Sequence, residues 1–314
     1  MKFAILGAGA LGTILGAHLS RAGHEVAMIV RGERARILQR QGLVLNGLSD
    51  IKARPTVIDD PQKLRETGTL IIATKAIDTA AALETLRHVR VDNAFSVQNG
   101  VLKNELLARV FGFSRVLGAV ADFSGELLAN GEVKFTRNVC LHIGEEKGGA
   151  SPRAENLAAT IDTAGVRCVA ASNIRTREWS KFAGWIAGFP LAVLTRQITW
   201  KYMMDPSSAL VMVHIVRETA QLAAAMKIEL TDMPPLPVPS IACPRSRTCC
   251  AAAAWNTRRR WVTRWPRAAS SAYPCPRSIP ATASSRWHTH DGDRQGSGSI
   301  CLQMVPDPIP VACD

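Results

Sequence analysis

The chain has 314 residues, of which 47% are hydrophobic and 20% are charged. This composition excludes an intrinsically disordered protein, and the length suits two domains with a core each. The formal net charge is +12, but ten arginines less four aspartates after residue 242 supply six of those charges. The rest of the chain is therefore only mildly basic.

The cysteines and the apolar segments indicate a protein of the cytoplasm. Only Cys140 and Cys168, of 8 cysteines, precede residue 243, and neither belongs to a CxxC pair, so we expect a reducing, cytoplasmic location. The apolar run Phe3–Leu19 resembles a signal peptide, but its regularly placed glycines favour a strand-to-helix turn. The longest later apolar run, Phe182–Leu194, is too short to cross a bilayer, and we expect no membrane contact.

The first residues have the pattern of a β-α-β unit. We predict a strand at Lys2–Leu6, a helix at Leu11–Ala22 that stops at Gly23, and a strand at Glu25–Val30. Further strands are predicted at Thr69–Ala73, Ala94–Val97, Arg115–Val120 and Val139–Ile143, with helices at Thr79–Arg90 and Glu105–Val110. Strands that alternate with helices predict a mostly parallel sheet.

The pattern becomes helical in the second half of the chain. After one more helix at Ala154–Ala164 and one more strand at Val166–Ala170, the apolar spacing is helical only. We predict helices at Thr176–Gly188, continuing with a kink past Pro190, and at Ser207–Met226. The predicted domains are therefore an α/β domain at residues 1–172 and a mainly α-helical domain at residues 173–242.

Residues 243–314 form an aberrant tail rich in Arg, Trp, Cys and Pro. Lys227 is the last lysine and Glu229 the last glutamate of the chain. We interpret this change as a reading-frame shift near residues 233–243, which leaves the helical domain incomplete and the tail poorly ordered. A nucleic-acid-binding appendage is the alternative. The cysteines and histidines of the tail match no regular metal-ligand spacing, so we expect no metal site. We also expect no nucleic-acid binding.

A glycine motif lies between the first strand and the first helix. The residues Gly7, Ala8, Gly9, Ala10, Leu11 and Gly12 fit the pattern G-x-G-x-x-G. Such glycines permit a tight turn, close approach of the backbone to a pyrophosphate and close packing of the helix, whose N-terminus attracts phosphates. The motif predicts an N-terminal Rossmann dinucleotide-binding domain, followed by the mainly α-helical C-terminal domain.

The residue after the second strand indicates which dinucleotide is bound. An acidic residue there would hold the ribose hydroxyl of NAD, whereas this chain has Arg31, with Arg34 and Arg36 close behind. Guanidinium groups suit the 2′-phosphate of NADP(H) by charge and by forked hydrogen bonds. A solvated basic loop is the alternative interpretation.

With these features the chain resembles the ketopantoate reductase family over about residues 1–230. The resemblance rests on the glycine motif, Arg31, Thr74-Lys75, Val97-Gln98-Asn99-Gly100 and Glu178-Trp179-Ser180-Lys181. It implies the NADPH-dependent reduction of a small branched 2-oxo acid, namely 2-dehydropantoate to pantoate in pantothenate biosynthesis. It also implies that Lys75 lies beside the cofactor, that Asn99 contacts cofactor and substrate, and that Lys181 binds substrate and donates the proton.

The residues themselves are compatible with these roles. Asn99 follows a predicted strand at the carboxyl edge of the sheet, where open α/β sheets bind ligands. Lys181 lies in an otherwise apolar helix, so its ammonium must reach either the surface or a polar cleft. An ammonium in a cleft could stabilise and protonate the alkoxide that forms when hydride reaches a ketone.

The chain departs from the family in two places. Many relatives have Asn one and two turns after the lysine, where this chain has Trp185 and Phe189, so either the pocket is built differently or the 2-oxo acid is more apolar. The family's later Ser and Glu are missing after residue 240. Alternatives are therefore a catalytically impaired NADP-binding protein and a related β-hydroxyacid or opine-type dehydrogenase. We expect any homodimer to form through the helical domain.

Overall fold

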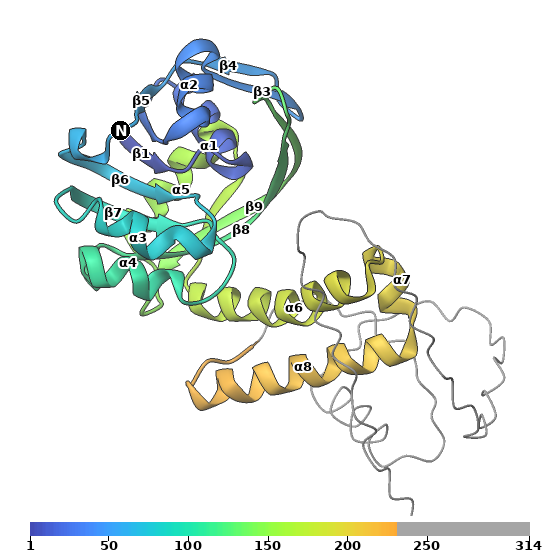
Figure 1. Ribbon diagram of the computed structural model, residues 1–314. Coiled ribbons are helices and arrows are strands. Elements are labelled where there is room, and N and C mark those ends of the chain that lie inside the picture. Colours follow the sequence, from blue (N-terminus) through green and yellow to red (C-terminus); the bar gives the residue numbers. More distant parts are fainter. Residues whose placement is uncertain (231–314) are drawn as a thin grey trace, which may run out of the picture. The chain divides into compact units, whose positions relative to one another are not determined.

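The computed structural model describes residues 1–230, which all belong to one compact unit of the chain. Its first sheet is entirely parallel, with the strand order β5-β2-β1-β6-β7 (Figure 1). The strands are β1 (Lys2–Leu6), β2 (Glu25–Ile29), β5 (Thr56–Ile58), β6 (Glu66–Ile72) and β7 (Arg90–Ser96). The predicted Rossmann arrangement is confirmed in this part of the chain.

The second sheet was not expected. It has the order β10-β9-β3-β4, and β8 pairs with β9 outside this path. Its strands are β3 (Leu43–Gly47), β4 (Ile51–Ala53), β8 (Leu117–Leu127), β9 (Val133–Glu145) and β10 (Cys168–Ala170). The strands predicted near residues 115–120 and 139–143 form a long antiparallel pair in this mixed sheet, and an isolated parallel bridge between Ala94 and Val116 joins their start to the first sheet.

A tight turn explains this antiparallel pairing. Leu128 and Glu132 close the connection with a 2.8 Å backbone hydrogen bond, and Gly131 adopts a φ of 85°. A short connection of this kind can join only antiparallel strands. The Asn130-Gly131 pair is a hairpin signal that the sequence analysis did not use.

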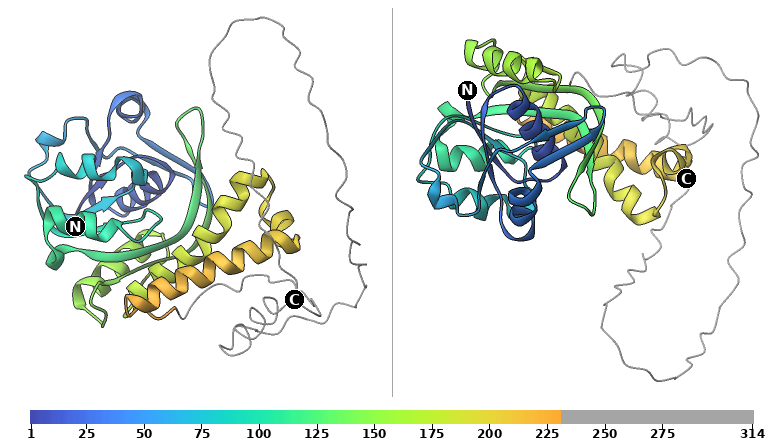
Figure 2. Two further views of the ribbon diagram at one scale, coloured as in Figure 1. Left: turned by 60° about the horizontal axis from the view of Figure 1, so that its bottom comes forward. Right: turned by 90° about the horizontal axis from the view of Figure 1, so that it is seen from above.

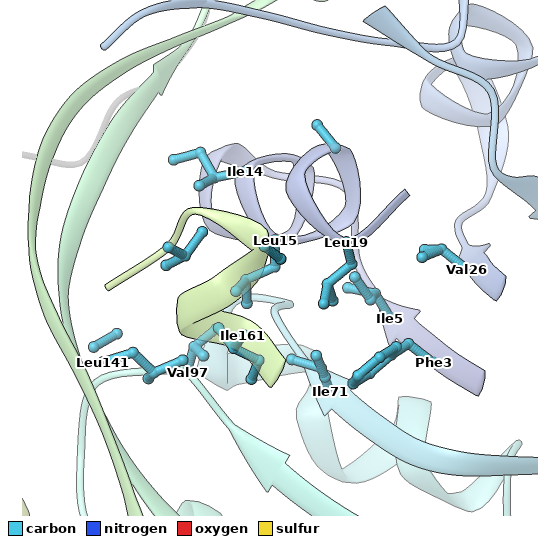
Figure 3. Close-up of a cluster of buried hydrophobic side chains, with 14 of the residues drawn as sticks. Phe3, Ile5, Ile14, Leu15, Leu19, Val26, Ile71, Val97, Leu141 and Ile161 are labelled. Carbon is cyan, nitrogen blue, oxygen red and sulfur yellow. The ribbon is translucent and has the colours of Figure 1, made fainter. Parts of the chain in front are cut away.

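Helix α1 (Ala10–Arg21) lies in the core between the two sheets (Figure 3). Every residue from Gly12 to Leu19 is buried, and Ile14, Leu15 and Leu19 are fully enclosed. A helix that is apolar on all sides must be buried on all sides. Each large side chain in this core contributes about 1.5–3 kcal/mol to stability.

Four further helices complete the α/β part. Helices α2 (Gly32–Gln41), α3 (Thr79–Glu84) and α4 (Lys103–Phe111) follow strands of the first sheet, and α5 (Pro152–Ala164) packs beside β9 and β10. Helix α3 is shorter than predicted, because β7 begins at Arg90 and the residues between them form tight turns.

Three helices form the last described part of the chain. They are α6 (Ile174–Thr195), α7 (Thr199–Met204) and α8 (Pro206–Ala225), and α6 contains Pro190. Helices α6 and α8 pack side by side, as both views of Figure 2 show, and α6 also packs on β8. Both helices predicted here are confirmed.

No helix within residues 1–230 is long and apolar enough to cross a bilayer. The predicted tail at residues 243–314, its proposed frame shift and the end of the predicted domain 173–242 lie outside the described residues.

Candidate functional site

Three loops lie at the carboxyl ends of neighbouring parallel strands. The glycine turn follows β1, the Thr74-Lys75 segment follows β6, and the segment Gln98–Gly100 follows β7. Because these strands are adjacent and parallel, their following loops meet at one edge of the sheet, where open α/β sheets bind ligands.

The glycine turn depends on two close approaches. Gly7 has a φ of 102°, and a Cβ atom on it would lie 2.9 Å from the Ala73 carbonyl carbon. A Cβ atom on Gly12 would lie 2.1 Å from the Gly7 carbonyl oxygen, so only glycine at this position lets the helix pack against the turn. A Cβ atom on Gly9 would have no protein atom nearer than 4.0 Å, which leaves the outer side of the turn open to a ligand.

The open side of the turn is the amino end of α1. Gly9 caps the helix without a side-chain hydrogen bond, Ala10 begins it, and no acidic residue lies in its first turn. The first amide groups of the helix, including that of Leu11, therefore remain available to an anion. Together, Gly7, Ala8, Gly9, Ala10, Leu11 and Gly12 have the geometry that a dinucleotide diphosphate requires.

Of the three arginines after β2, Arg34 has a structural task. Its Nε donates to the Ala8 carbonyl at 2.8 Å, and its Nη2 donates to the Thr13 hydroxyl at 3.0 Å. A third bond joins Nη1 to the Gly131 carbonyl at 2.6 Å. The three hydrogen bonds of the Arg34 guanidinium thus stabilise the glycine turn, and they leave this group unavailable as a phosphate ligand.

Arg31 is the available guanidinium at this edge. It is the exposed N-cap residue of α2, directly after β2, and no residue of the described chain bonds its side chain. Arg36, in contrast, pairs with Glu33 at 3.4 Å on the surface of α2.

Gln98 joins the second and third loops. Its Nε2 donates to the Thr74 carbonyl at 2.7 Å and to the Thr79 hydroxyl at 2.6 Å, while its Oε1 accepts from Ser96 Oγ at 3.0 Å. Lys75 lies exposed beside this junction, and Asn99 is the exposed residue directly after Gln98. The buried amide of Gln98 therefore holds the backbone that presents both Lys75 and Asn99.

A pocket lies between the segment that follows β7, the residues Ala119–Ala121 of β8, and α6. The side chains that matter for its chemistry are Asn99, Lys103, Glu178, Lys181, Phe182 and Trp185. The structure thus brings Asn99 and Lys181 together at one pocket. The glycine turn, Arg31 and Lys75 lie outside the lining of this pocket, along the same edge of the sheet.

The ammonium of Lys181 points into the polar part of the pocket. Its Nζ donates to the carbonyl oxygen of Ala121 at 2.6 Å. Burial, and then the charge of Lys103, lower the pKa of Lys181 from 10.5 to about 8, against an opposing effect of Asp122. Lys181 is therefore a cation that can give up a proton near neutral pH.

One wall of the pocket is aromatic. Phe182 and Trp185 line it, and the ring of Trp185 packs edge-on against Phe189 with 4.5 Å between the ring centroids. Phe189 itself is 51% exposed. Of the two positions where many relatives have Asn, only Trp185 therefore faces the pocket.

Of two buried charged residues at the pocket, the sequence analysis missed Lys103 and named Glu178 only as part of a motif, without a role. Lys103 and Glu178 form an ion pair of 3.2 Å, and their side chains are only 6% and 3% exposed. Asn104 donates from Nδ2 to Glu178 at 2.7 Å and to Glu146 at 2.6 Å. The one available signal was that Glu178 lies three residues before Lys181 and hence on the same side of α6.

Glu146 is the outermost member of this network. Burial, and then the nearby charge of Glu178, raise the pKa of Glu146 from 4.5 to about 7. Asn104, Lys103 and Arg175 act in the opposite direction but do not offset these two effects. The network thus contains a carboxyl group that titrates near neutral pH.

Comparisons with known proteins give the same family as the sequence motifs. Residues 3–148 match the family described as ketopantoate reductase PanE/ApbA. A 2-dehydropantoate 2-reductase of Archaeoglobus fulgidus is 29% identical over 225 residues, which are 72% of this chain and 74% of that protein.

Solved structures share the fold. A putative ketopantoate reductase from Ralstonia solanacearum superposes with a TM-score of 0.68 at 24% identity, over 74% of this chain and 79% of that one. A D-mandelate dehydrogenase, solved with NADH and anilino(oxo)acetate, gives a TM-score of 0.68 at 20% identity, over 81% and 79% of the chains. At these identities the likeness concerns the fold alone.

The raised pKa of Glu146 predicts how stability changes with pH. Between pH 4.5 and about 7 the folded protein binds more protons at this carboxyl than the unfolded chain, so unfolding free energy falls as pH rises through that range. Glu146→Gln keeps a carbonyl acceptor for Asn104 and removes the charge. We expect the variant to be more stable than the natural chain by about 3 kcal/mol at pH 8 and nearly equal at pH 4.5.

Urea unfolding at both pH values measures this difference. Glu126→Gln, which changes an exposed carboxyl on β8, is the matched control and should alter neither value. An E146Q variant no more stable than the natural chain at pH 8 would contradict the prediction.

Proposed function

Because residues 3–148 are a domain of the ketopantoate reductase PanE/ApbA family, we propose that the chain is an NADPH-dependent oxidoreductase that reduces a small 2-oxo acid to its 2-hydroxy acid. The observation that carries this proposal is the meeting of Asn99 and Lys181 at one pocket, along the same edge of the sheet as the open amino end of α1. By family resemblance the substrate is 2-dehydropantoate, and the product is pantoate, in pantothenate biosynthesis.

The first loops would hold the cofactor. The amide groups at the start of α1 suit its diphosphate, Arg31 suits the 2′-phosphate of NADP(H), and Lys75 and Asn99 are available toward the nicotinamide side. When bound, the dinucleotide supplies the hydride that reduces the C2 carbonyl. The chain's own residues then have to orient the carbonyl and provide one proton.

Lys181 is suited to provide that proton. We assign Asn99 to the positioning of the ketone through its amide, and Lys181 to the stabilisation of the developing negative charge on the carbonyl oxygen. The Lys181 ammonium transfers a proton to this oxygen as the hydroxyl forms, and solvent returns a proton to the neutral amine. Its lowered pKa, about 8, makes the transfer more favourable than from an ordinary lysine.

The aromatic wall favours a second candidate substrate. Phe182 and Trp185 cannot replace the amide hydrogen bonds that Asn residues offer to a hydroxylated substrate. A 2-oxo acid with an apolar side chain would bury that side chain against these rings. We therefore propose such an acid as the alternative to 2-dehydropantoate.

Other parts of the proposal concern the whole chain. We assign cofactor binding to residues 1–172, and substrate binding and any homodimer contact to residues 173–242, in a cytoplasmic protein. The alternative remains a catalytically impaired NADP-binding protein, if the C-terminal part of the active site is missing. Dinucleotide binding without turnover of any 2-oxo acid would favour that alternative.

Arg31 is expected to decide the preference for NADPH. Arg31→Met should weaken NADPH binding about 10-fold to 100-fold, because a charge-assisted bond to the 2′-phosphate is lost, and should leave NADH binding unchanged. Titration calorimetry with both dinucleotides measures this. Arg36→Met is the matched control, since that guanidinium is engaged with Glu33. Equal losses for NADPH and NADH would contradict the assignment.

Lys181 is expected to carry the proton transfer. Lys181→Met should lower kcat/KM by about 10²-fold to 10⁴-fold and leave NADPH binding intact. Because the acid form is required, kcat/KM of the natural chain should be constant below about pH 8 and fall above it. Steady-state assays between pH 6 and pH 10, with the exposed Lys147→Met variant as control, test both statements. Full activity in K181M would overturn the role.

Trp185 is expected to set the choice between the two substrates. If the apolar acid is the substrate, kcat/KM for 3-methyl-2-oxobutanoate or phenylglyoxylate should exceed that for 2-dehydropantoate. Trp185→Asn should then reduce this preference about 10-fold or more, since burial of the substrate's apolar group is lost. A chain that prefers 2-dehydropantoate before and after the substitution would reject the second candidate.

A further inference from the structure

The buried pair of Lys103 and Glu178 lies between the elements that carry Asn99 and Lys181. Lys103 is the first residue of α4, soon after the Asn99 loop, and Glu178 lies one turn before Lys181 in α6. Withdrawing two charges from water is costly, and a pair of this kind is weak evidence for stability. The position of the pair points instead to a role in aligning the two elements that carry Asn99 and Lys181.

The ammonium of Lys103 is fully used by the protein. It donates to the carbonyl oxygens of Ser96 and Gln98 at 3.1 Å each, and to that of Ala119. An ammonium has three donors, so none is left for a substrate. Two of these bonds hold the backbone that immediately precedes Asn99, and the third ties it to β8.

The carboxylate of Glu178 completes the connection. Its Oε1 accepts the Ala119 amide at 2.9 Å, so the N–H and C=O groups of Ala119 are both satisfied by this ion pair. On the side of β8 away from β9, the pair thus takes the place of a neighbouring strand. Lys181 bonds the carbonyl of Ala121, two residues further along the same edge.

We propose that Lys103 is a positioning residue which, with Glu178, holds the Asn99 loop and the Lys181 helix in register on the free edge of β8. The inference rests on the proposed reduction of a 2-oxo acid, and it adds a residue that touches neither substrate nor cofactor. Lys103 acts through the two residues that it aligns and through its charge.

The charge of Lys103 gives this role a measurable signature. The charged groups that act on Lys181 come from three other elements, namely Lys103 of α4, Asp122 of β8 and Arg137 of β9, while Glu178 on its own helix pairs with Lys103. Lys103 and Arg137 lower the pKa of Lys181, whereas Asp122 raises it. Loss of the Lys103 charge must therefore raise the pKa of Lys181.

Lys103→Met and Lys103→Arg separate the two effects in the full chain. The methionine variant should lose about 10²-fold in kcat/KM through misplacement of Asn99 and Lys181, with unchanged NADPH binding. Its decline of kcat/KM with pH should also move to higher pH. The arginine variant keeps the charge, so it should lose activity while its decline stays at the natural pH.

A second variant and a second measurement protect the test. Lys103→Met combined with Glu178→Met replaces the pair by apolar side chains of similar size, a change that buried pairs often tolerate. The protonation of Lys181 is read without turnover, from the rate of its acetylation against pH by mass spectrometry. The midpoint should rise in K103M, should rise less in the double variant because the pair that it removes carries little net charge, and should stay unchanged in K103R and in the surface control Lys147→Met.

The possible outcomes are distinct. Natural kcat/KM and a natural acetylation midpoint in K103M would overturn the inference, as would an equal shift of the midpoint in K103M and K103R. A natural chain that reduces no 2-oxo acid would overturn the proposed function alone, because the acetylation midpoints do not depend on turnover.

Discussion

The burial of α1 from Gly12 to Leu19 is the constraint on which the rest of the structure depends. The helix lies against β1 and β2 on one side and against β3, β8 and β9 on the other, so its packing fixes how far apart the two sheets can be. Gly16 shows how tight this packing is, because a Cβ atom there would lie 2.8 Å from the Met28 sulfur and 3.0 Å from Leu43. Gly12 packs equally closely against the Gly7 carbonyl, and this contact places the amino end of α1 at the edge of the sheet where the loops meet.

The second sheet contributes to the site through its free edge. On the side of β8 away from β9, polar side chains rather than a strand satisfy the backbone at Ala119 and Ala121. Alternate carbonyls on one side of a strand are about 7 Å apart, so Lys103 and Lys181 lie about one such step apart along it. A sheet edge that would otherwise be open is thereby converted into the wall of a pocket.

Local patterns were enough to predict the first part of the fold. The strand Lys2–Leu6 agrees with the prediction residue for residue, and the following helix differs by one residue at each end, because glycine spacing and continuous apolar runs are local signals. The antiparallel pairing of β8 and β9 depended on the turn at Gly131, and the end of α3 depended on where β7 pairs. Neither follows from the periodicity of one segment.

The candidate site was predictable to a similar degree. Motifs led to Asn99 and Lys181, which line one pocket, and to Arg31, which is available beside the glycine turn. They could not separate Arg31 from Arg34, because the bonds of Arg34 to Ala8 and Gly131 join distant segments. Lys103 was missed for the same reason, since its importance comes from contacts with β7, β8 and α6 and not from its neighbours in sequence.

Two opposing electrostatic effects set the behaviour of Lys181, and burial is the larger. Burial alone would favour the neutral amine, and the Lys103 charge acts in the same direction, whereas Asp122 retains part of the preference for the cation. Glu178 neutralises much of the Lys103 charge at 3.2 Å, so Lys103 can stand close to a second ammonium without driving it fully neutral. The buried carboxylate is thus the counterion of the Lys103 ammonium, at the strand edge to which Lys181 also donates. An apolar residue in place of Glu178 would leave two ammonium groups facing the same strand edge without this counterion, and the loss of one partner from a buried pair is strongly destabilising.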